Sequence, residues 1–444
     1  MSTTTLNVVD VIDRNRVGAM QVLVLVLCTL CQIIDGFDVQ AIGYVAPAII
    51  KGWGVAKSDL GPVFGAGLVG MTIGALAVSP FADRLGRKPM LAGAMAFISL
   101  CAYATSHATT ISELLALRLA TGLGMGAMIP VAVAMAGEFS PARMRVTLMM
   151  MTSSGFIVGG AFGGAVAAWL IPSFGWQSVF VVGAVAPLVL AALILLLMPE
   201  SPQFMAVKQR SASKIARILK GIDPTLKADT DYQFTVPEKK NKGARLLQLF
   251  RNGLGTGTVL LWVVNFMNLL ATYFLANWLP VLMSEAGHGP SQAILAGTIF
   301  WVGGIAGNLL IGWFADRKGF GPTLSVVFIA AAIAMASIGQ VAGSLTSVFM
   351  VITAVGFCVL GGQTALNALG AVYYPISIRS TGMGWALGIG RLGAIFGPVL
   401  GGELIRLNWT ASELFMAAAI PLVLALCTTL VFWRQGSLPR SATA

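Results

Sequence analysis

Long apolar runs separated by short polar loops constrain the fold of this chain more than any other feature. Hydrophobic residues make up 57% of the 444 positions and charged residues only 10%, too few charges to cover the surface of a soluble protein. A helix of about 20 apolar residues spans a bilayer. We therefore expect an all-α membrane protein with twelve transmembrane helices. The expected spans are 20–46, 60–82, 89–106, 112–136, 147–170, 177–198, 256–283, 291–314, 322–340, 345–370, 381–404 and 413–434.

The basic residues gather on one side of these spans. The net charge is +11, and 23 of the 28 Lys and Arg residues lie in segments on the side of the N-terminus. Since cytoplasmic loops carry an excess of Lys and Arg, we expect both termini in the cytoplasm and a multi-pass protein of the plasma membrane, in a bacterium the inner membrane. This placement accounts for the positive charge without a nucleic-acid partner.

One long polar segment, 199–255, divides the spans six and six. We therefore predict an N-terminal six-helix bundle at 1–198, a cytoplasmic central loop at 199–255 and a C-terminal six-helix bundle at 256–444. Within the loop, residues 203–221 carry apolar side chains near helical spacing, with Lys and Arg between them. This pattern predicts a helix that lies on the cytoplasmic leaflet.

The two halves of the chain repeat one another in a single register. Parallel repeats related by an axis along the membrane normal are the architecture of one large class of transporters. We therefore expect two bundles related by a pseudo-two-fold axis. At an offset of 233 or 234 residues, the matching pairs are Pro47 and Pro280, Asp83 and Asp316, Gly122 and Gly356, Pro141 and Pro375, Arg145 and Arg379, Gly159 and Gly393, and Gly163 and Gly397.

Four motifs resemble the major facilitator superfamily over essentially the whole chain: FADRLGRK at 81–88, RLATGLGMG at 118–126, PESPQF at 199–204 and FADRKG at 314–319. The sequence DGFD at 35–38 resembles the aromatic acid:proton symporter family, whose substrates include 4-hydroxybenzoate, benzoate, gentisate and muconate. One departure is Ser79, where the superfamily pattern has Gly, while the second copy keeps Gly312. We expect helix packing at the first of these loops to differ slightly.

This resemblance implies proton-coupled uptake of a small aromatic carboxylic acid by alternating access, and no enzymatic activity. We expect no cofactor, the proton being the coupling ion, and a monomer in the lipid bilayer. His107 and His288 lie far apart in outer loops, so no metal site is predicted.

Four charged residues lie well inside the expected spans: Asp35, Asp38, Arg118 and Arg391. Each costs about 2.5–3.5 kcal/mol to insert at the centre of a bilayer, so intramembrane charges face a wet cavity or one another and are functional candidates. We expect all four to line a common aqueous space between the two bundles.

The two acidic residues are three positions apart and therefore share a helix face. A carboxylate there can take up a proton outside and release it inside, so Asp35 and Asp38 are our predicted coupling site. Arg118 can hold a carboxylate ionised, and the resemblance links this arginine with proton coupling. Arg391 is the predicted clamp for the substrate carboxylate, because a guanidinium matches that group bidentately. The alternative for Asp38 and both arginines is a structural ion pair.

An aromatic substrate requires ring surfaces and a few hydrogen-bonding groups. Asn268 is the strongest polar candidate, since the repeat aligns it with Asp35. The other predicted substrate-binding residues are Phe37, Tyr44, Phe274, Trp278, Gln363 and Asn367, within a wider set that includes Trp301, Trp385 and Asn265.

The repeat also separates two kinds of charge. Every intramembrane charge occurs in one half only, whereas the loop charges occur in both. We therefore assign the asymmetric residues to binding and coupling, and the symmetric residues to rocking and gating. The predicted cytoplasmic gate, which would hold the halves together when the protein opens outward, comprises Asp83, Arg84, Arg87, Glu138, Arg145, Asp316, Arg317 and Arg379.

Three alternatives stay open. A sugar or another organic anion could be the cargo of the same fold, because PESP also occurs in sugar porters. Proton-linked export is equally compatible with these residues. A membrane enzyme or a receptor is disfavoured, because the spans hold no nucleophile–base pair or metal-spaced cysteines and the outer loops are short.

Overall fold

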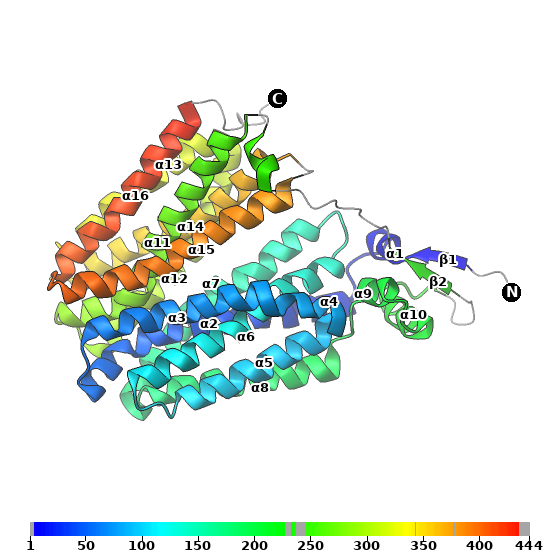
Figure 1. Cartoon of the computed structure of the whole chain (residues 1–444), viewed down its shortest axis with the longest axis horizontal. Helices are drawn as coiled ribbons and strands as arrows, with labels where there is room; N and C mark the ends of the chain where they lie inside the picture. Colours follow the sequence, from blue (N-terminus) through cyan, green and yellow to red (C-terminus); the bar gives the residue numbers. More distant parts are fainter. Residues whose placement is uncertain are drawn as a thin grey trace.

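Two sets of six long helices account for most of the chain that the structure describes (Figure 1). The structure is a computed structural model and describes residues 4–226, 232–236, 246–251, 253–341, 343–375 and 378–434. The N half contains α2 (Ala19–Trp53), α3 (Leu60–Ile73), α5 (Arg87–Thr105), α6 (Ile111–Glu138), α7 (Arg145–Phe174) and α8 (Gln177–Leu197). The C half contains α11 (Gly255–Glu285), α12 (Pro290–Lys318), α13 (Phe320–Ser337), α14 (Leu345–Tyr373), α15 (Arg379–Arg406) and α16 (Ala411–Arg434).

Eleven helices of the described residues are long and apolar enough to cross a membrane. The helix α5, with 19 residues, is not among them, but it packs along α6 and α8 inside the N half. Each half therefore consists of six helices, and the expected all-α architecture of two six-helix bundles is confirmed. The first span is longer than expected, because α2 continues through Pro47 to Trp53.

The internal repeat is visible in the packing of each half. The pairs α2–α7, α3–α6 and α5–α8 of the N half correspond to α11–α15, α12–α14 and α13–α16 of the C half. A Cβ atom added at Gly159 would lie 2.0 Å from the carbonyl oxygen of Ile33, and one added at Gly393 would lie 2.1 Å from that of Phe266. The two glycines are 234 positions apart and their partners 233, so the repeat deduced from the sequence is reproduced at the level of atoms.

The second helix of the N half breaks before its loop, whereas its counterpart α12 does not. After α3, the chain forms a π-helical turn at Gly74–Val78 (η2), a 3₁₀ turn at Ser79–Phe81 (η3) and the short helix α4 (Ala82–Leu85). Proline has no N–H for the helix ladder, and Pro80 lies at this break. The difference in packing expected near Ser79 is thus a change of helix type.

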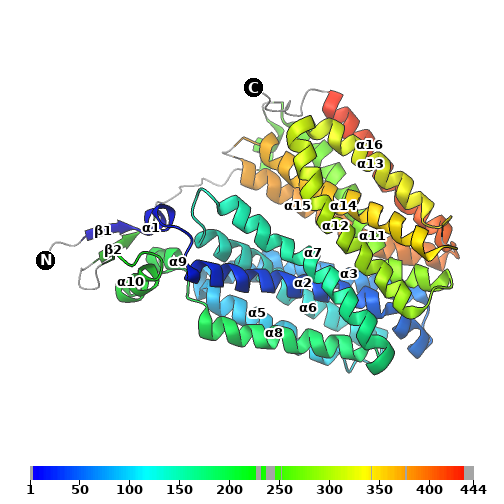
Figure 2. The same cartoon turned by 180° about the vertical axis from the view of Figure 1, so that it is seen from behind.

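The two halves meet at one end and diverge toward the other (Figures 1 and 2). Contacts between them run from α2 to α11, from α3 to α15 and from α7 to α12. At the end where α2 finishes, the 3₁₀ turn η1 (Lys57–Asp59) packs on α15, and Lys57 forms an ion pair with Glu285 of α11. We call this the opposite end. The end where α2 begins carries most of the basic residues and is called the basic end.

A small cap covers the basic end of the N half. It consists of β1 (Thr4–Asn7), α1 (Val8–Arg14), α9 (Pro202–Val207), α10 (Ala212–Lys220) and β2 (Tyr232–Thr235), and a 3₁₀ turn, η4 (Leu246–Phe250), precedes α11. The strands β1 and β2 pair in parallel, with Thr4 opposite Tyr232. The cap lies beside α4, away from the C half (Figure 1).

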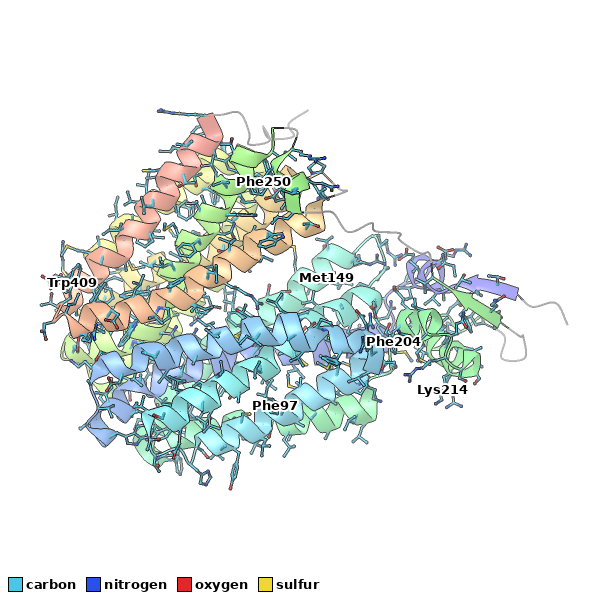
Figure 3. All side chains as sticks on the ribbon, viewed as in Figure 1. Phe97, Met149, Phe204, Lys214, Phe250 and Trp409 are labelled. Atoms are coloured by element: carbon cyan, nitrogen blue, oxygen red, sulfur yellow. The ribbon has the colours of Figure 1, made fainter. Side chains whose placement is uncertain are left out.

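The cap corrects the prediction of a helix lying on the membrane surface. Although α10 is amphipathic, its apolar residues Ile215 and Leu219 are buried in the protein core, together with Val8 and Ile12 of α1. Its basic residues stay exposed, as Figure 3 shows for Lys214. The apolar face is therefore covered by protein and is not available to lipid.

Candidate functional site

Asp38 and Arg118 form a buried ion pair in the N half. Asp38 on α2 and Arg118 on α6 are 1% and 2% exposed. The Nη2 atom of Arg118 lies 3.0 Å from Oδ2 and 3.1 Å from Oδ1 of Asp38, and its Nη1 atom donates to the Asp38 carbonyl oxygen at 3.1 Å. The guanidinium also lies over the Phe180 ring, 5.3 Å from the centroid. This arginine therefore occupies both carboxylate oxygens of Asp38.

Asp35 has a different environment, one turn earlier on α2. Its side chain is buried, yet its Oδ1 atom has no hydrogen-bond partner among the described residues. The charges that act on it most strongly are those of Arg391 and Asp38. A buried carboxylate without full hydrogen bonding is unfavourable unless a cation or a proton compensates it. Asp35 is thus the intramembrane acid that is free to exchange partners.

Arg391 of the C half is the cation whose charge acts most strongly on Asp35. It lies on α15, is only partly buried, and has no carboxylate within ion-pair distance in the described chain. Both Arg391 and Asp35 also act on the hydroxyl of Tyr273 on α11. Tyr273 combines a ring with a polar tip and lies close to Asn268 on the same helix, but it belongs to none of the motifs that predict the other site residues.

Four amide side chains of α11 and α14 form a connected cluster in the C half. The Nδ2 atom of Asn268 donates to the Val359 carbonyl oxygen at 3.2 Å and to Oε1 of Gln363 at 2.9 Å. The Nε2 atom of Gln363 donates to Oδ1 of Asn265 at 2.9 Å and to Oδ1 of Asn367 at 3.1 Å. The structure thus brings together three predicted residues, Asn268, Gln363 and Asn367, and adds Asn265.

The predicted aromatic residues divide into two groups. Tyr44, Trp278 and Trp301 lie where the halves meet: Tyr44 packs between α7 and α12, Trp278 against Phe64 of α3, and Trp301 against Phe156 of α7. Phe37 and Phe274 pack inside their own halves, Phe37 against Gly163 and Gly183, and Phe274 against Gly401. Trp385 is 42% exposed and stacks on Trp262.

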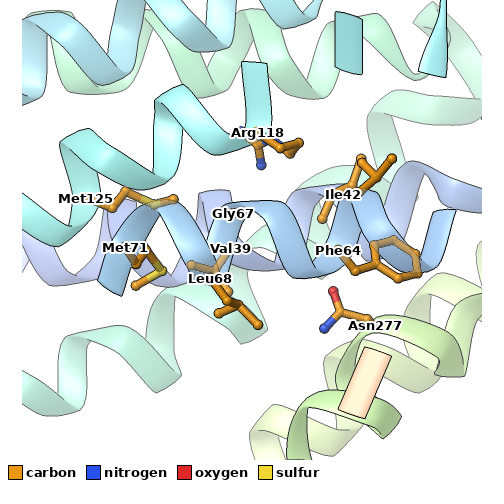
Figure 4. Close-up of a pocket in the computed structure, with 10 residues that line it drawn as sticks. Val39, Ile42, Phe64, Gly67, Leu68, Met71, Arg118, Met125 and Asn277 are labelled. Carbon is orange, nitrogen blue, oxygen red and sulfur yellow. The ribbon is translucent and has the colours of Figure 1, made fainter. Parts of the chain in front are cut away.

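A small cavity adjoins the Asp38–Arg118 pair at the junction of the halves (Figure 4). Arg118 lines one side of it and Asn277 of α11 the other, with apolar side chains between them. The Nε atom of Arg118 is buried and has no hydrogen-bond partner in the described part of the chain. The ion pair therefore borders space that reaches the contact with the C half.

At the basic end, the predicted gate residues make contacts only within their own halves, as far as the described residues show. Arg87 pairs with Asp83 at 3.0 Å and with Glu138 at 3.2 Å, all in the N half. Arg145 donates to the Ser140 carbonyl oxygen at 3.2 Å, and its repeat counterpart Arg379 donates to that of Tyr374 at 3.3 Å. Arg84, Asp316 and Arg317 are exposed. Arg317 also lies over the ring of Trp313 on its own helix. In this conformation the gate residues do not join the halves.

The chain resembles known proteins over nearly its whole length. The chain matches the profile of the Major Facilitator Superfamily over residues 28–260 and 261–443. It is 38% identical to the 4-hydroxybenzoate transporter PcaK of Pseudomonas putida over 95% of this chain and 94% of that protein. It is also 38% identical to a gallate transporter of Pseudomonas putida, over 94% of this chain and 92% of that protein.

Two solved structures, each 18% identical to this chain, compare the fold alone. A bacterial homologue of the lysosomal transporter Spinster, in an inward-facing conformation, superposes with a TM-score of 0.73 over 96% of this chain and 99% of that chain, at 18% identity. The xylose transporter XylE of E. coli, in an inward-open conformation, gives a TM-score of 0.72 over 94% of this chain and 97% of that chain, at 18% identity.

Proposed function

The chain belongs to the major facilitator superfamily, and we propose that it imports a small aromatic carboxylic acid, such as 4-hydroxybenzoate, together with a proton by alternating access. Relatives at 37–39% identity carry 4-hydroxybenzoate or gallate, which supports an aromatic acid as cargo. Two solved structures of xylose transporters are 18% and 16% identical to this chain and support only the shared fold.

One observation carries the proposal: an incompletely bonded acid of the N half is acted on by the charge of an arginine of the C half that has no ion-pair partner in the described chain. In a region of low dielectric, the favoured states are those in which charges compensate one another. Asp35 and Arg391 compensate each other when the site is empty. When Asp35 is protonated, Arg391 is free to bind the carboxylate of a substrate.

This exchange of partners couples the flux of protons to the flux of the substrate anion. Loading only the anion would leave two negative charges beside one arginine, and loading only the proton would leave the arginine uncompensated. The favourable states therefore contain both the proton and the anion or neither of them. Only these states should allow the halves to rock, which makes the transport a symport with one proton for each carboxylate at this site.

We propose that the Asp38–Arg118 pair fixes the geometry and charge around Asp35. The pair lies one turn further along α2, and the charge of Asp38 acts on Asp35.

Under the positive-inside rule, the basic end faces the cytoplasm, with both termini on that side of a bacterial inner membrane. The divergence of the halves at the basic end then corresponds to an inward-open state, and the same chain works as a monomer.

The direct test is a counterflow assay in proteoliposomes with purified protein. Vesicles are loaded with an unlabelled compound and placed in a solution of its labelled form. The compounds tested in this way are 4-hydroxybenzoate, benzoate, muconate and hexoses. We expect exchange of aromatic acids and accumulation when an inward proton gradient is imposed. Transport of a hexose without competition from any benzoate would overturn the proposal.

Arg391→Gln should weaken substrate binding more than it impairs folding. Losing a hydrogen-bonded charge contact of about 1.5–3 kcal/mol raises the apparent dissociation constant about 10-fold to 150-fold. The measurement is substrate-dependent stabilisation of the detergent-solubilised protein, repeated with Arg406→Gln as the control. Arg406 pairs with Glu403 on the surface of the same helix. Equal affinity in Arg391→Gln and the wild type would exclude Arg391 as the carboxylate clamp.

A cysteine pair at positions 57 and 285 should arrest transport when oxidised. Lys57 and Glu285 join the two halves at the opposite end, and this end must open for an outward-facing state. We expect uptake to fall to background after oxidation and to recover after reduction, measured in proteoliposomes of the double variant made in a background without other cysteines. The single-cysteine variants serve as controls. Undiminished uptake in the crosslinked protein would show that the ends of the halves do not separate there.

A further inference from the structure

The amide cluster of the C half has a definite orientation. Backbone carbonyl oxygens accept hydrogen bonds and never donate them. Asn268 must therefore turn its NH₂ group toward the Val359 carbonyl oxygen, and Asn265 must turn its NH₂ group toward that of Leu261, at 2.8 Å. Gln363, which lies between them, then accepts from Asn268 and donates to Asn265. Two carbonyl groups thus fix the direction of the whole chain of hydrogen bonds.

This orientation leaves an acceptor without a donor. The Oδ1 atom of Asn268 has no hydrogen-bond partner among the described residues, and the side chain is 0% exposed. A buried carbonyl oxygen without a donor is unfavourable. The NH₂ groups of Asn265, Asn268 and Gln363 are all engaged, so what the cluster lacks at Asn268 is a hydrogen-bond donor.

The cluster lies beside the arginine that we assign to the substrate carboxylate. Gly390, the residue before Arg391, packs against Leu269 and Asn265 of α11. Gln363, Asn367 and Arg391 are all partly exposed, whereas Asn268 is buried. Through Asn265 and Gln363, the cluster thus extends from the backbone next to Arg391 to the buried Asn268.

We propose that Asn268, supported by Gln363, binds a hydrogen-bond donor on the ring of the substrate, and that the chain therefore selects ring-hydroxylated aromatic acids over unsubstituted ones. This inference rests on the proposed function. An ionised benzoate has no donor, and its carboxylate oxygens are repelled by a carbonyl oxygen, so the acid group belongs at Arg391. A ring hydroxyl supplies the donor that Asn268 lacks. A ring amine has the same chemistry, and the assay must distinguish the two.

The test is competition against labelled 4-hydroxybenzoate in the counterflow assay with the full chain. The competitors are benzoate, 4-aminobenzoate and 4-methoxybenzoate, which has oxygen at the same position but no donor. We expect 4-hydroxybenzoate to bind at least about tenfold more tightly than benzoate or 4-methoxybenzoate. Equal competition by 4-methoxybenzoate would overturn the proposal. Stronger competition by 4-aminobenzoate than by 4-hydroxybenzoate would assign the site to ring amines and overturn the hydroxyl preference.

Asn268→Leu, which keeps roughly the same volume, should abolish this preference. We expect the affinity for 4-hydroxybenzoate to fall about tenfold or more, while that for benzoate stays the same. Gln363→Leu tests the cluster from α14 and should reduce the preference in the same direction, so the proposal remains testable if one variant does not fold. The control is Gln292→Leu, since Gln292 is an exposed amide side chain in the first turn of α12 that accepts a hydrogen bond from the backbone of Gly289 and lies outside the cluster.

The outcomes separate this inference from the proposed function. If no aromatic acid exchanges in the wild type, the proposed function itself fails. If aromatic acids exchange but the affinities for 4-hydroxybenzoate and benzoate fall equally in both cluster variants, the cluster has a structural role and the inference is wrong. Loss of affinity confined to the hydroxylated acid supports it.

Discussion

Asp35→Asn is expected to abolish proton-driven accumulation while leaving exchange of substrate across the membrane intact. Asparagine resembles a carboxylic acid that is permanently protonated, so Arg391 stays free to bind the substrate anion but no proton is carried. The variant would then move the anion alone. An inside-negative potential opposes the entry of an anion by about 2.3 kcal/mol per charge for each 100 mV. At about 100 mV, the equilibrium concentration of a monoanion should therefore be about 50-fold lower inside the vesicles than outside.

The measurement compares two modes in the same proteoliposomes. Counterflow without gradients reports exchange, and uptake with an imposed proton gradient and potential reports coupling; a pH-sensitive dye inside the vesicles records the proton flux. Wild-type protein should accumulate substrate with internal acidification, and Asp35→Asn should show exchange only. Accumulation with acidification in Asp35→Asn would remove this residue from the coupling mechanism.

Asp83→Asn is the matched control, because Asp83 is an acid of the same bundle that the repeat duplicates as Asp316. Asp83 is exposed and pairs with Arg87 at the basic end. Its loss should slow exchange and accumulation alike, as expected of a residue that acts in gating. Equal loss of uptake with unaltered binding in Asp35→Asn and Asp83→Asn would contradict the division between asymmetric coupling residues and symmetric gating residues.

The parts of the fold that the sequence predicts are those set by composition and repetition. Apolar runs predict the spans, because a bilayer admits few alternatives to helices, and the 233–234 offset predicts that α2–α7 and α11–α15 pack alike. The intramembrane charges predict that acids and arginines meet. The partners could not be assigned, since Asp35 and Asp38 differ by only about 60° around the helix and their neighbours depend on the rotation of α2.

The sequence does not determine those parts of the structure in which one residue pattern is compatible with two environments. The amphipathic sequence of α10 is compatible with a lipid surface and with a protein surface. In the structure, α1 and β2 cover its apolar face, so the helix packs on protein. The pairing of β1 with β2 joins four-residue strands that are 228 positions apart, as in Thr4 and Tyr232. The role predicted for Phe37 depends on which face of α2 meets α7 and α8, and packing across the whole bundle sets that face.

The largest loss of stability is expected from breaking the buried pair on one side only. Asp38→Asn leaves the charge of Arg118 buried without its carboxylate, and removing one partner of such a pair costs about 3–5 kcal/mol. Replacing both residues, as in Asp38→Asn combined with Arg118→Met, removes the uncompensated charge and should recover most of that loss. Thermal unfolding of the detergent-solubilised protein measures both effects, with the exposed pair Arg406 and Glu403 as the control site.

Transport by the double variant then distinguishes a structural pair from a coupling pair. Because the charge of Asp38 acts on Asp35, we expect the double variant to fold and to exchange substrate, but with a displaced pH dependence and weakened proton-driven accumulation. Accumulation with the wild-type pH profile would mean that Asp38 and Arg118 only hold α2 against α6. An unchanged unfolding temperature in Asp38→Asn would instead show that the ion pair does not hold the bundle together. Only a pair that both supports the helices and sets the charge around Asp35 gives loss of stability in the single variant and loss of coupling in the double one.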